Sequence, residues 1–189
     1  RLEMVKDIAS LANVFSVRQK NPRGLGHAVL CAKSFVGDEP FAILLGDDIV
    51  VNKNGKTATQ QLVEAYEEFG GSVVGVQKVA DSQVHKYGII DPKENLTERC
   101  ASVKGFVEKP KLEDAPSNFA ILGRYVLTPK IFELLETQAP GKGNEIQITD
   151  AIDRLTKEEN VFAYDFEGNR YDVGDKVGFL KAQIDFALD

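Results

Sequence analysis

Two adjacent carboxylates stand where a strand is predicted to end. Residues 41–45 (FAILL) form a continuous apolar run, as expected for a strand buried on both faces, and Gly46, Asp47 and Asp48 follow it. In open α/β sheets, ligands bind beyond the carboxyl ends of the strands. A carboxylate there can hold Mg²⁺, with phosphate oxygens and water completing the shell. Neighbouring side chains point in different directions, so at most one of the two is the metal ligand. A loop aspartate that caps the next turn is the alternative.

A second carboxylate, far away in the sequence, can complete such a metal site. Asp172 ends a short strand-like run and is followed by a glycine turn and a helical pattern. Its carboxylate can share one cation with Asp47, since Mg²⁺ takes one or two protein carboxylates. The alternative is that Asp172 or Asp175 caps the final helix, and capping is the favoured interpretation for Asp175.

The segment Glu108-Lys109-Pro110 ends another strand-like run and carries both charges. Proline disfavours helical geometry in the residue before it, so Lys109 is expected to be extended and to project from the strand end. Its ammonium is then a point charge suited to a phosphate group, and Glu108 can accept hydrogen bonds from sugar hydroxyls. A solvent-exposed ion pair is the alternative interpretation.

The loop 18–27 (RQKNPRGLGH) joins a strand-like run to a helical pattern. Its glycines allow close backbone approach, and a helix N-terminus favours an anion. The loop lacks the third glycine of the dinucleotide fingerprint and is not a Walker loop, so as a phosphate cradle it is weak. Gln19 offers both a donor and an acceptor, which suits the edge of a planar base.

Composition excludes several other classes of protein. The 189 residues carry a net charge of −6, with 43% hydrophobic and 28% charged residues, as in a soluble globular domain. This charge favours neither nucleic acid nor an anionic membrane, and no apolar run reaches the ~20 residues of a membrane helix. The two cysteines are too few for a disulfide scaffold and indicate a reducing compartment, the cytoplasm. The two histidines form no metal-ligand pattern with them, and Cys31 falls on an apolar helix face, so we expect it in the core.

The first 80 residues alternate strand-like and helical patterns. The chain opens on what reads as the tail of a helix, and strands are predicted over 13–19, 41–45 and 72–79. Helices are predicted over 25–35 and 59–69, the second ending at Gly70-Gly71. This βαβαβ order predicts a mostly parallel sheet with helices on both faces.

The rest of the chain predicts a different pattern. Strand-like runs at 87–90, 102–108 and 120–127 have no long helix between them, which indicates an antiparallel insertion or a sheet edge. Helices are predicted from Pro129, with Thr128 as N-cap, and over 145–156 and 175–188. Residues 161–166 and 170–173 flank Glu167-Gly168-Asn169 and predict a hairpin.

Taken together, these blocks resemble a known family. VRQKNPRGLGHAVLCAKSFVGDEPFAILLGDDIV, KYGIIDP, FVEKPK, APSNFAILGRYVL, NEIQITDAI and YDVGDKVGFLKA closely resemble, in order, the bacterial UTP–glucose-1-phosphate uridylyltransferases. The resemblance covers essentially the whole chain. It implies the nucleotide-diphospho-sugar transferase fold, a three-layer α/β/α sandwich with a mixed central sheet. It also implies transfer of the uridylyl group of UTP to glucose 1-phosphate, giving UDP-glucose and pyrophosphate, with Mg²⁺ as cofactor.

The resemblance implies a role for each matching residue. For the nucleotide, Gln19 is expected at the uracil edge with the Gly24 backbone nearby, and Asp47 and Asp172 are expected to hold Mg²⁺. The remaining roles concern the sugar phosphate: the Gly88 backbone beneath the sugar, Glu108 on its hydroxyls, Lys109 on its phosphate and Glu145 shaping the pocket.

The chain departs from the family in one respect. Family members begin with a strand and a glycine-rich GxGTRxxPxTK-like loop around the triphosphate, and no such motif occurs here. We therefore expect a single domain, 1–189, that is N-terminally truncated and has little activity alone. A sugar nucleotidyltransferase of other specificity and a non-catalytic regulatory paralogue are the alternatives. Family members commonly form dimers or tetramers, so a homo-oligomer is expected by analogy.

Overall fold

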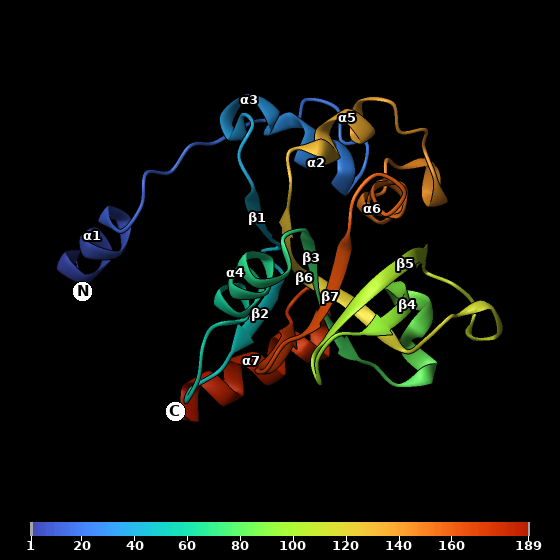
Figure 1. The fold of residues 1–189 in the computed structure, drawn as a ribbon. Coiled ribbons are helices and arrows are strands. Elements are labelled where there is room, and N and C mark those ends of the chain that lie inside the picture. Colours follow the sequence, from blue (N-terminus) through green and yellow to red (C-terminus); the bar gives the residue numbers. More distant parts are fainter. Residues whose placement is uncertain (1, 189) are drawn as a thin grey trace.

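A six-stranded mixed sheet forms the centre of the computed structural model, which describes residues 2–188 (Figure 1). The strands lie in the order β1-β6-β3-β7-β5-β4. Their bounds are β1 Phe41–Leu44, β3 Ser72–Lys78, β4 Gly88–Asn95, β5 Cys100–Glu108, β6 Phe119–Leu127 and β7 Val161–Asp165.

The first half of the chain does not form the mostly parallel sheet that its pattern predicts. β3 and β7 are parallel, whereas β1 pairs antiparallel with β6. β1 therefore lies at the edge of the sheet, and its residues alternate between half-buried and exposed. Leu44 is 54% exposed. The prediction that residues 41–45 are buried on both faces was wrong, because a continuous apolar run does not reveal which strand lies beside it.

The antiparallel insertion predicted for the middle of the chain is confirmed, and it closes part of the sheet on itself. β4 pairs antiparallel with β5, and β5 pairs antiparallel with β7. β4 also bridges to β6 at Ile89 and Ala120. The strands β6, β3, β7, β5 and β4 thus form a closed ring, whose inward side chains fill its interior as in a small barrel.

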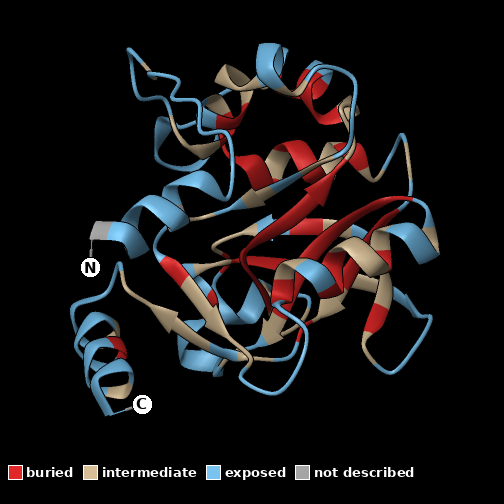
Figure 2. Cartoon of the chain, turned by 90° about the vertical axis from the view of Figure 1, so that its left-hand side faces the viewer, coloured by how far each residue is buried: buried red, intermediate tan, exposed pale blue. Residues whose placement is uncertain are grey.

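Helices cover both faces of this sheet, as the three-layer prediction requires. They are α1 Leu2–Ser10, α2 Leu25–Cys31, α3 Lys33–Val36, α4 Ala58–Phe69, α5 Lys130–Glu136, α6 Ile148–Leu155 and α7 Lys176–Leu188, with short 3₁₀ turns η1 Asp81–Lys86, η2 Leu112–Asp114 and η3 Lys142–Asn144. α2, α5 and α6 share one hydrophobic core with the sheet, and α4 shares the other. Figure 2 shows these buried surfaces meeting at the central strands.

The predicted stop of α4 is confirmed, and its start has a capping residue that the pattern did not predict. Thr57 is the N-cap, and its hydroxyl accepts a hydrogen bond from the Gln60 amide at 3.2 Å. Gly70 ends the helix in the left-handed region, with φ of 69°. Glycine adopts this conformation without the steric cost that a side chain brings, so it stops the helix.

Other helix boundaries differ from prediction. The run 25–35 is divided into α2 and α3 at Ala32, and Pro129 rather than Thr128 is the N-cap of α5. The Thr128 hydroxyl instead donates to the Glu159 carboxylate at 2.8 Å. α6 begins at Ile148 rather than at residue 145. Cys31 is half-buried, not in the core, whereas Cys100 is buried and burial raises its pKa to about 11.

The predicted hairpin at Glu167-Gly168-Asn169 was wrong. β7 joins the large sheet, and β8 (Asn169–Asp172) pairs antiparallel with β2 (Asp48–Val51) in a separate two-stranded sheet. In this second sheet Asp48 lies opposite Asp172. The pairing therefore brings the two acidic segments of the sequence together.

The run 13–19 forms no strand within the described residues, although its pattern predicts one. A strand exists only through pairing, and this extended segment has no neighbouring strand. Val14 and Phe15 are largely exposed, and α1, the helix expected at the start of the chain, lies apart from the body at the end of this segment (Figure 1).

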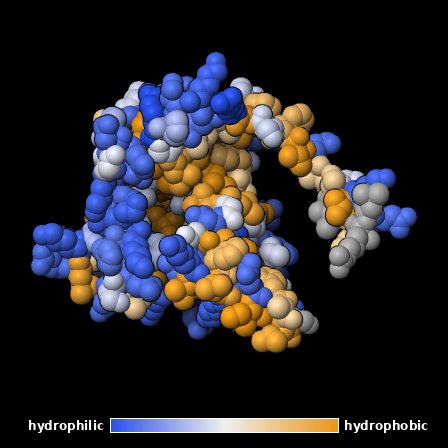
Figure 3. All heavy atoms as spheres, turned by 180° about the vertical axis from the view of Figure 1, so that it is seen from behind, coloured by the Kyte–Doolittle hydropathy of each residue, from blue (hydrophilic) through white to orange (hydrophobic). Residues whose placement is uncertain are grey.

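The final helix, α7, is largely exposed. It packs on β8, with the Tyr171 and Phe186 rings 5.7 Å apart, and Ala182 is its one buried residue. Figure 3 shows hydrophobic surface along this helix at the lower right of the view. None of the helices within residues 2–188 has both the length and the apolar character of a membrane span.

Candidate functional site

One cavity, of about 310 Å³, gathers most of the residues that the sequence singles out. It lies where β2, β4, β5, β6 and β8 meet the N-terminal part of α6. Six predicted site residues line it: Asp47, Gly88, Glu108, Lys109, Glu145 and Asp172. They come from five separate stretches of chain, so the fold and not sequence proximity brings them together.

Asp47 and Asp172 face the same point beside Gly174. A Cβ placed on Gly174 would lie 3.2 Å from Asp47 Oδ2 and 3.3 Å from Asp172 Oδ1. The backbone holds them there, since the Val173 amide donates to the Asp47 carbonyl at 2.8 Å. Residues 2–188 contain no group of three acidic, histidine or cysteine side chains arranged to hold a metal. Two carboxylates nonetheless fit a hard cation that takes its other oxygens from phosphates and water.

Asp175 acts as the predicted cap rather than as part of this pair. Its carboxylate accepts from the amides of Val177 and Gly178 at 3.1 and 3.2 Å, at the start of α7. Asp172 also accepts from the Asp175 amide, at 3.3 Å.

Asp48 is buried and is committed to an ion pair with Arg170. Arg170 Nε donates to Asp48 Oδ1 in a short hydrogen bond, and the two side chains are 15% and 9% exposed. Burial raises the pKa of the Asp48 carboxyl, although the hydrogen bond and charge of Arg170 act to lower it. Asp48 is therefore a structural partner of Arg170. Of the two adjacent aspartates, Asp47 is the one that is open to a ligand.

Arg170 is the main residue of this site that the sequence pattern did not predict. Besides Asp48, its guanidinium donates to Asp172 Oδ2 at 3.4 Å and to the Tyr87 hydroxyl at 3.2 Å. It also lies over the Tyr87 ring, 5.2 Å from the centroid. One sequence feature could have indicated it. Side chains alternate along a strand, so Arg170 lies on the same face of β8 as Asp172.

Lys109 has an unusual backbone conformation. Its φ is 48°, so the extended geometry predicted from Pro110 was wrong. Hydrogen bonds from elsewhere in the chain fix this conformation: the Lys109 amide donates to the Tyr87 carbonyl at 3.0 Å, and Lys142 Nζ donates to the Lys109 carbonyl at 2.5 Å. A left-handed non-glycine residue costs about 1–3 kcal/mol, and such strain concentrates at functional sites.

The two charges of the Glu108-Lys109 segment form an unequal pair. Lys109 Nζ lies 3.1 Å from Glu108 Oε1, and the side chains are 42% and 10% exposed. The two side chains do form the ion pair considered for this segment, but only the lysine is exposed. The ammonium reaches solvent and the cavity, while the carboxylate is held against the protein.

Gly88 forms a close-packed side of the cavity. A Cβ on Gly88 would lie 2.8 Å from Thr149 Oγ1 and 3.2 Å from Glu108 Oε2. Gly88 is buried, and only a glycine leaves room for these two polar groups. Thr149 is a further polar lining residue that the sequence analysis did not single out.

Gln19 and Gly24 lie beside the cavity rather than in its lining. Gln19 Nε2 lies 3.3 Å from the Gly24 carbonyl and 2.6 Å from His27 Nδ1. Gly24 packs against the segment that carries Glu145, and the amide of Ile146 donates to the Arg23 carbonyl at 2.6 Å. The structure thus joins the predicted base-binding loop to one wall of the cavity.

Replacing Gly24 by alanine should displace that wall and destabilise the protein. Gly24 has φ of 102°, and a Cβ there would lie 2.8 Å from both Glu145 Cβ and the Ile146 carbonyl. We expect Gly24→Ala to lower the free energy of unfolding by about 2–3 kcal/mol, measured by urea denaturation. Gly37→Ala is the matched control, because φ is also positive there (66°) but no atom lies within 4 Å. Equal losses in the two variants would contradict the packing argument.

The charge of the cavity lining favours a ligand that arrives with a cation. The lining contains five carboxylates, from Asp47, Asp48, Glu108, Glu145 and Asp172, and three cationic side chains, from Lys86, Lys109 and Arg170. The buried Tyr125 hydroxyl also lines it, and its pKa is raised by burial and by nearby carboxylates. A phosphate ligand alone would meet net negative charge, whereas a phosphate–cation complex would not.

Comparison with known proteins agrees with this geometry. A family model described as nucleotidyl transferase matches residues 3–187. UTP–glucose-1-phosphate uridylyltransferase 2 of Staphylococcus saprophyticus is 60% identical over 187 residues. A UTP–glucose-1-phosphate uridylyltransferase of Staphylococcus epidermidis is 58% identical over the same length. In both cases the match covers 99% of this chain and 64% of the relative, so the chain spans about 64% of their length.

Solved structures show the same similarity. The crystal structure of a UDP-glucose pyrophosphorylase complexed with UDP-glucose has a TM-score of 0.95 and 41% identity, covering 98% of this chain and 70% of that one. The UTP-bound enzyme from Acinetobacter baumannii has a TM-score of 0.86 and 39% identity, covering 99% and 66%. These relatives confirm the resemblance predicted from the sequence blocks, and the chain belongs to the nucleotidyl transferase family.

Proposed function

We propose that this chain forms the UDP-glucose-binding part of an enzyme that makes UDP-glucose and pyrophosphate from UTP and glucose 1-phosphate. The observation that carries the proposal is the cavity in which six predicted site residues meet. The relatives are named for this reaction, and one similar structure holds UDP-glucose. Because the chain spans 64% of those relatives, binding rather than turnover is the direct test of its own contribution.

The proposed roles follow the geometry of the cavity. The sugar lies between Gly88, whose backbone lines the cavity, and the carboxylates of Glu108 and Glu145, which accept hydrogen bonds from its hydroxyls. The uracil lies toward Gln19 and Gly24, where the amide of Gln19 can meet the base edge. Lys109, partly exposed at the cavity, contacts the phosphate of the sugar.

In this reaction one substrate attacks the other directly, and no covalent bond to the protein is needed. A phosphate oxygen of glucose 1-phosphate attacks the α-phosphorus of UTP in line, and pyrophosphate leaves with the electron pair of the broken bond. The attacking oxygen is already anionic, so no general base is needed. Lys109 reduces the repulsion between the two phosphates as they approach, and the cavity fixes their orientation.

Nucleotidyl transferases of this family generally use a divalent metal. We propose Mg²⁺, held by Asp47 and Asp172, whose carboxylates flank the same point beside Gly174. When bound, the ion neutralises phosphate charge and polarises phosphate oxygens. The negative charge of the lining makes the protein itself dependent on such a cation for binding a nucleotide sugar.

The test is the dependence of UDP-glucose binding on Mg²⁺ in the 189-residue chain. By isothermal titration we expect binding that tightens at least fivefold when Mg²⁺ is added. Asp47→Asn and Asp172→Asn should each reduce this enhancement to less than twofold, because a neutral amide is a poor ligand for a hard cation. dTDP-glucose should bind more weakly than UDP-glucose.

Asp38→Asn is the matched control, since Asp38 is an exposed loop carboxylate remote from the cavity lining. It should leave both affinity and Mg²⁺ enhancement unchanged. Absence of UDP-glucose binding in folded wild-type chain would contradict the proposed function. Binding that ignores Mg²⁺ would contradict the metal role alone.

A further inference from the structure

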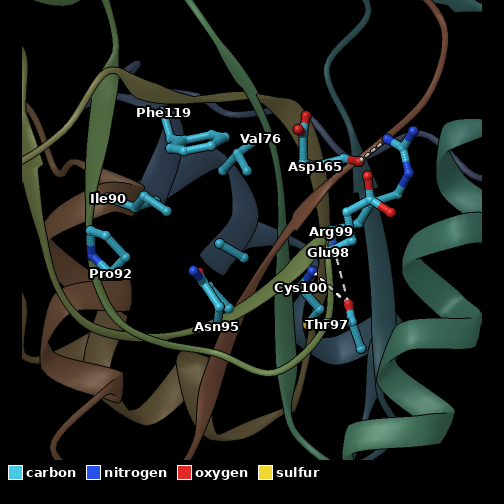
Figure 4. A pocket seen from close by; sticks show the side chains of 12 residues that line it. Val76, Ile90, Pro92, Asn95, Thr97, Glu98, Arg99, Cys100, Phe119 and Asp165 are labelled. Atoms are coloured by element: carbon cyan, nitrogen blue, oxygen red, sulfur yellow. Dashed lines mark hydrogen bonds between the residues drawn. The ribbon is translucent and has the colours of Figure 1, made fainter.

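A second cavity, of about 230 Å³, opens at the other end of the closed ring of strands. Its lining comes from all five ring strands and from the turn between β4 and β5. Figure 4 shows Phe119, Val76, Ile90 and Pro92 around it, with the side chain of Asn95 directed toward them. Val76 and Ile90 are buried, so this is the open end of the packed ring interior rather than a surface depression.

Small side chains at neighbouring positions create this space. Ala101 on β5 lies opposite Ala163 on β7, and it also lies opposite Asn95 on β4. Two residues further along β5 and β6, the same face carries the larger residues Val103 and Ile121, which belong to the buried core. Two adjacent alanines therefore leave a gap of the kind that a buried apolar ligand can occupy.

The rim of the cavity offers hydrogen-bond acceptors. Arg99 is already engaged, because its guanidinium donates to the Asp165 carbonyl at 3.1 Å and to Glu167 Oε1 at 2.5 Å. Within residues 2–188 the Asp165 carboxylate accepts no hydrogen bond, and the side-chain amide of Asn95 forms none. Burial raises the pKa of Asp165, although Arg99 and Lys78 lower it, so this carboxylate is partly withdrawn from water.

Hydrogen bonds hold the turn that forms one side of the rim. The Thr97 hydroxyl accepts from the amides of Arg99 and Cys100 at 3.2 and 2.9 Å, and the Leu96 amide donates to the Cys100 carbonyl at 2.8 Å. The cavity is thus bounded by strands and by a fixed turn. Its shape is largely preformed, which is typical of small-molecule sites.

The geometry points to an effector site for a small aromatic molecule of one or two rings that carries a hydrogen-bond donor. The size supports this class: an apolar cavity of ~150 Å³ holds benzene, and drug-sized ligands take roughly 300–1,000 Å³. The ring of Phe119 supplies an aromatic wall, and Lys78 Nζ lies over it, 5.2 Å from its centroid. Asp165 and Asn95 supply acceptors for the donor.

The strands connect this cavity to the candidate active site. β4 runs from Gly88, in the active-site lining, to Asn95, and β5 runs back from Ala101 to Glu108. β6 likewise runs from Phe119 to Tyr125. A ligand that orders these strands at one end changes the cost of ordering them at the other, so the two sites are coupled reciprocally. This consequence rests on the proposed function, whereas binding itself does not.

Indole is the probe, and its fluorescence can be followed directly because the chain contains no tryptophan. We expect saturable binding, with NMR shifts at the amides of Ile90, Phe119 and Ala163. Saturating indole should change the affinity for UDP-glucose at least threefold. Ala101→Leu, which fills the cavity, should weaken indole binding at least tenfold, and Ala163→Val is a gentler filling variant should the first fail to fold.

Ser102→Leu is the matched control, since Ser102 follows Ala101 on β5 and points to the opposite face. It should leave indole binding unchanged. Absence of saturable binding, or equal weakening by Ser102→Leu and Ala101→Leu, would overturn the site. Indole binding with an unchanged affinity for UDP-glucose would overturn the effector role. Failure of UDP-glucose to bind without indole would instead count against the proposed function.

Discussion

Replacing Arg170 by methionine should lower the free energy of unfolding by about 3–5 kcal/mol at pH 7. Arg170 pairs with Asp48, and both side chains are largely removed from solvent. Methionine keeps much of the apolar volume but leaves the Asp48 carboxylate buried without its cation. Tyr87 and Asp172 lose a donor as well. Urea denaturation followed by circular dichroism measures the loss.

The same variant should show a marked dependence on pH. Burial already raises the pKa of Asp48 against the opposing effect of Arg170, so removing the arginine raises it further. A carboxyl whose pKa is higher in the folded state than in the unfolded state favours folding when protonated, and this stability is lost as the pH rises through the folded-state pKa. The deficit of Arg170→Met relative to the wild type should therefore shrink as the pH falls from 7 toward 4.5.

Two further variants isolate the buried charge. Lys33→Met removes one partner of an exposed pair with Glu136 and should cost less than about 1 kcal/mol. The double variant Asp48→Asn/Arg170→Met removes both buried charges and should recover much of the loss. The interpretation fails if Arg170→Met costs no more than Lys33→Met, or if its deficit is the same at pH 4.5 as at pH 7.

Elements with strong local signals could be predicted from the sequence. The stop of α4 at Gly70 is one such signal, and it acts within the helix itself. The antiparallel strands of the middle of the chain were recognised because no helix separates them. Pairing could not be predicted in this way. The edge position of β1 depends on β6, about 80 residues away, and no local pattern encodes that partner.

The false hairpin between β7 and β8 illustrates the same limit. Gly168 permits a turn, but two glutamines from other elements hold this connection. Gln61 Nε2 donates to the Glu167 carbonyl, and Gln77 Nε2 donates to the carbonyls of Phe166 and Gly168. These bonds direct the chain out of the large sheet, so β8 pairs with β2 instead. A turn signal therefore predicts a change of direction but not the partner of the strand that follows.

More of the candidate site than of the strand pairing could be predicted from the sequence. Residue type limited the candidates, and the resemblance of ordered sequence blocks then selected Asp47, Glu108, Lys109 and Asp172, which the structure places in one cavity. Their individual roles stay predictions. Arg170 was missed because an arginine in a short strand is usually exposed. Its burial follows only from the pairing of β2 with β8.

Replacing Lys109 by glycine should separate stability from binding at this site. Both Lys109→Gly and Lys109→Ala remove the ammonium, so both should weaken UDP-glucose binding at least tenfold. This is the effect expected from losing one hydrogen bond to a charged group, which contributes ~1.5–3 kcal/mol. They differ in backbone cost, because φ at this position is 48°. Glycine adopts that conformation freely, so the glycine variant should be about 1 kcal/mol more stable than the alanine variant.

Comparing these two variants with each other is what makes the result interpretable. Each leaves the largely buried Glu108 without its neighbouring ammonium, and that shared cost cancels in the difference. Lys111→Met, at an exposed position two residues on, should leave affinity for UDP-glucose unchanged. If Lys109→Gly binds like the wild type, the ammonium does not contact the phosphate. If the two variants are equally stable, the hydrogen bonds that Lys109 forms with Tyr87 and Lys142 do not hold it in a strained conformation. The expected outcome, lost affinity with the alanine variant less stable than the glycine variant, would mean that the chain accepts backbone strain to keep a cation at the mouth of this cavity.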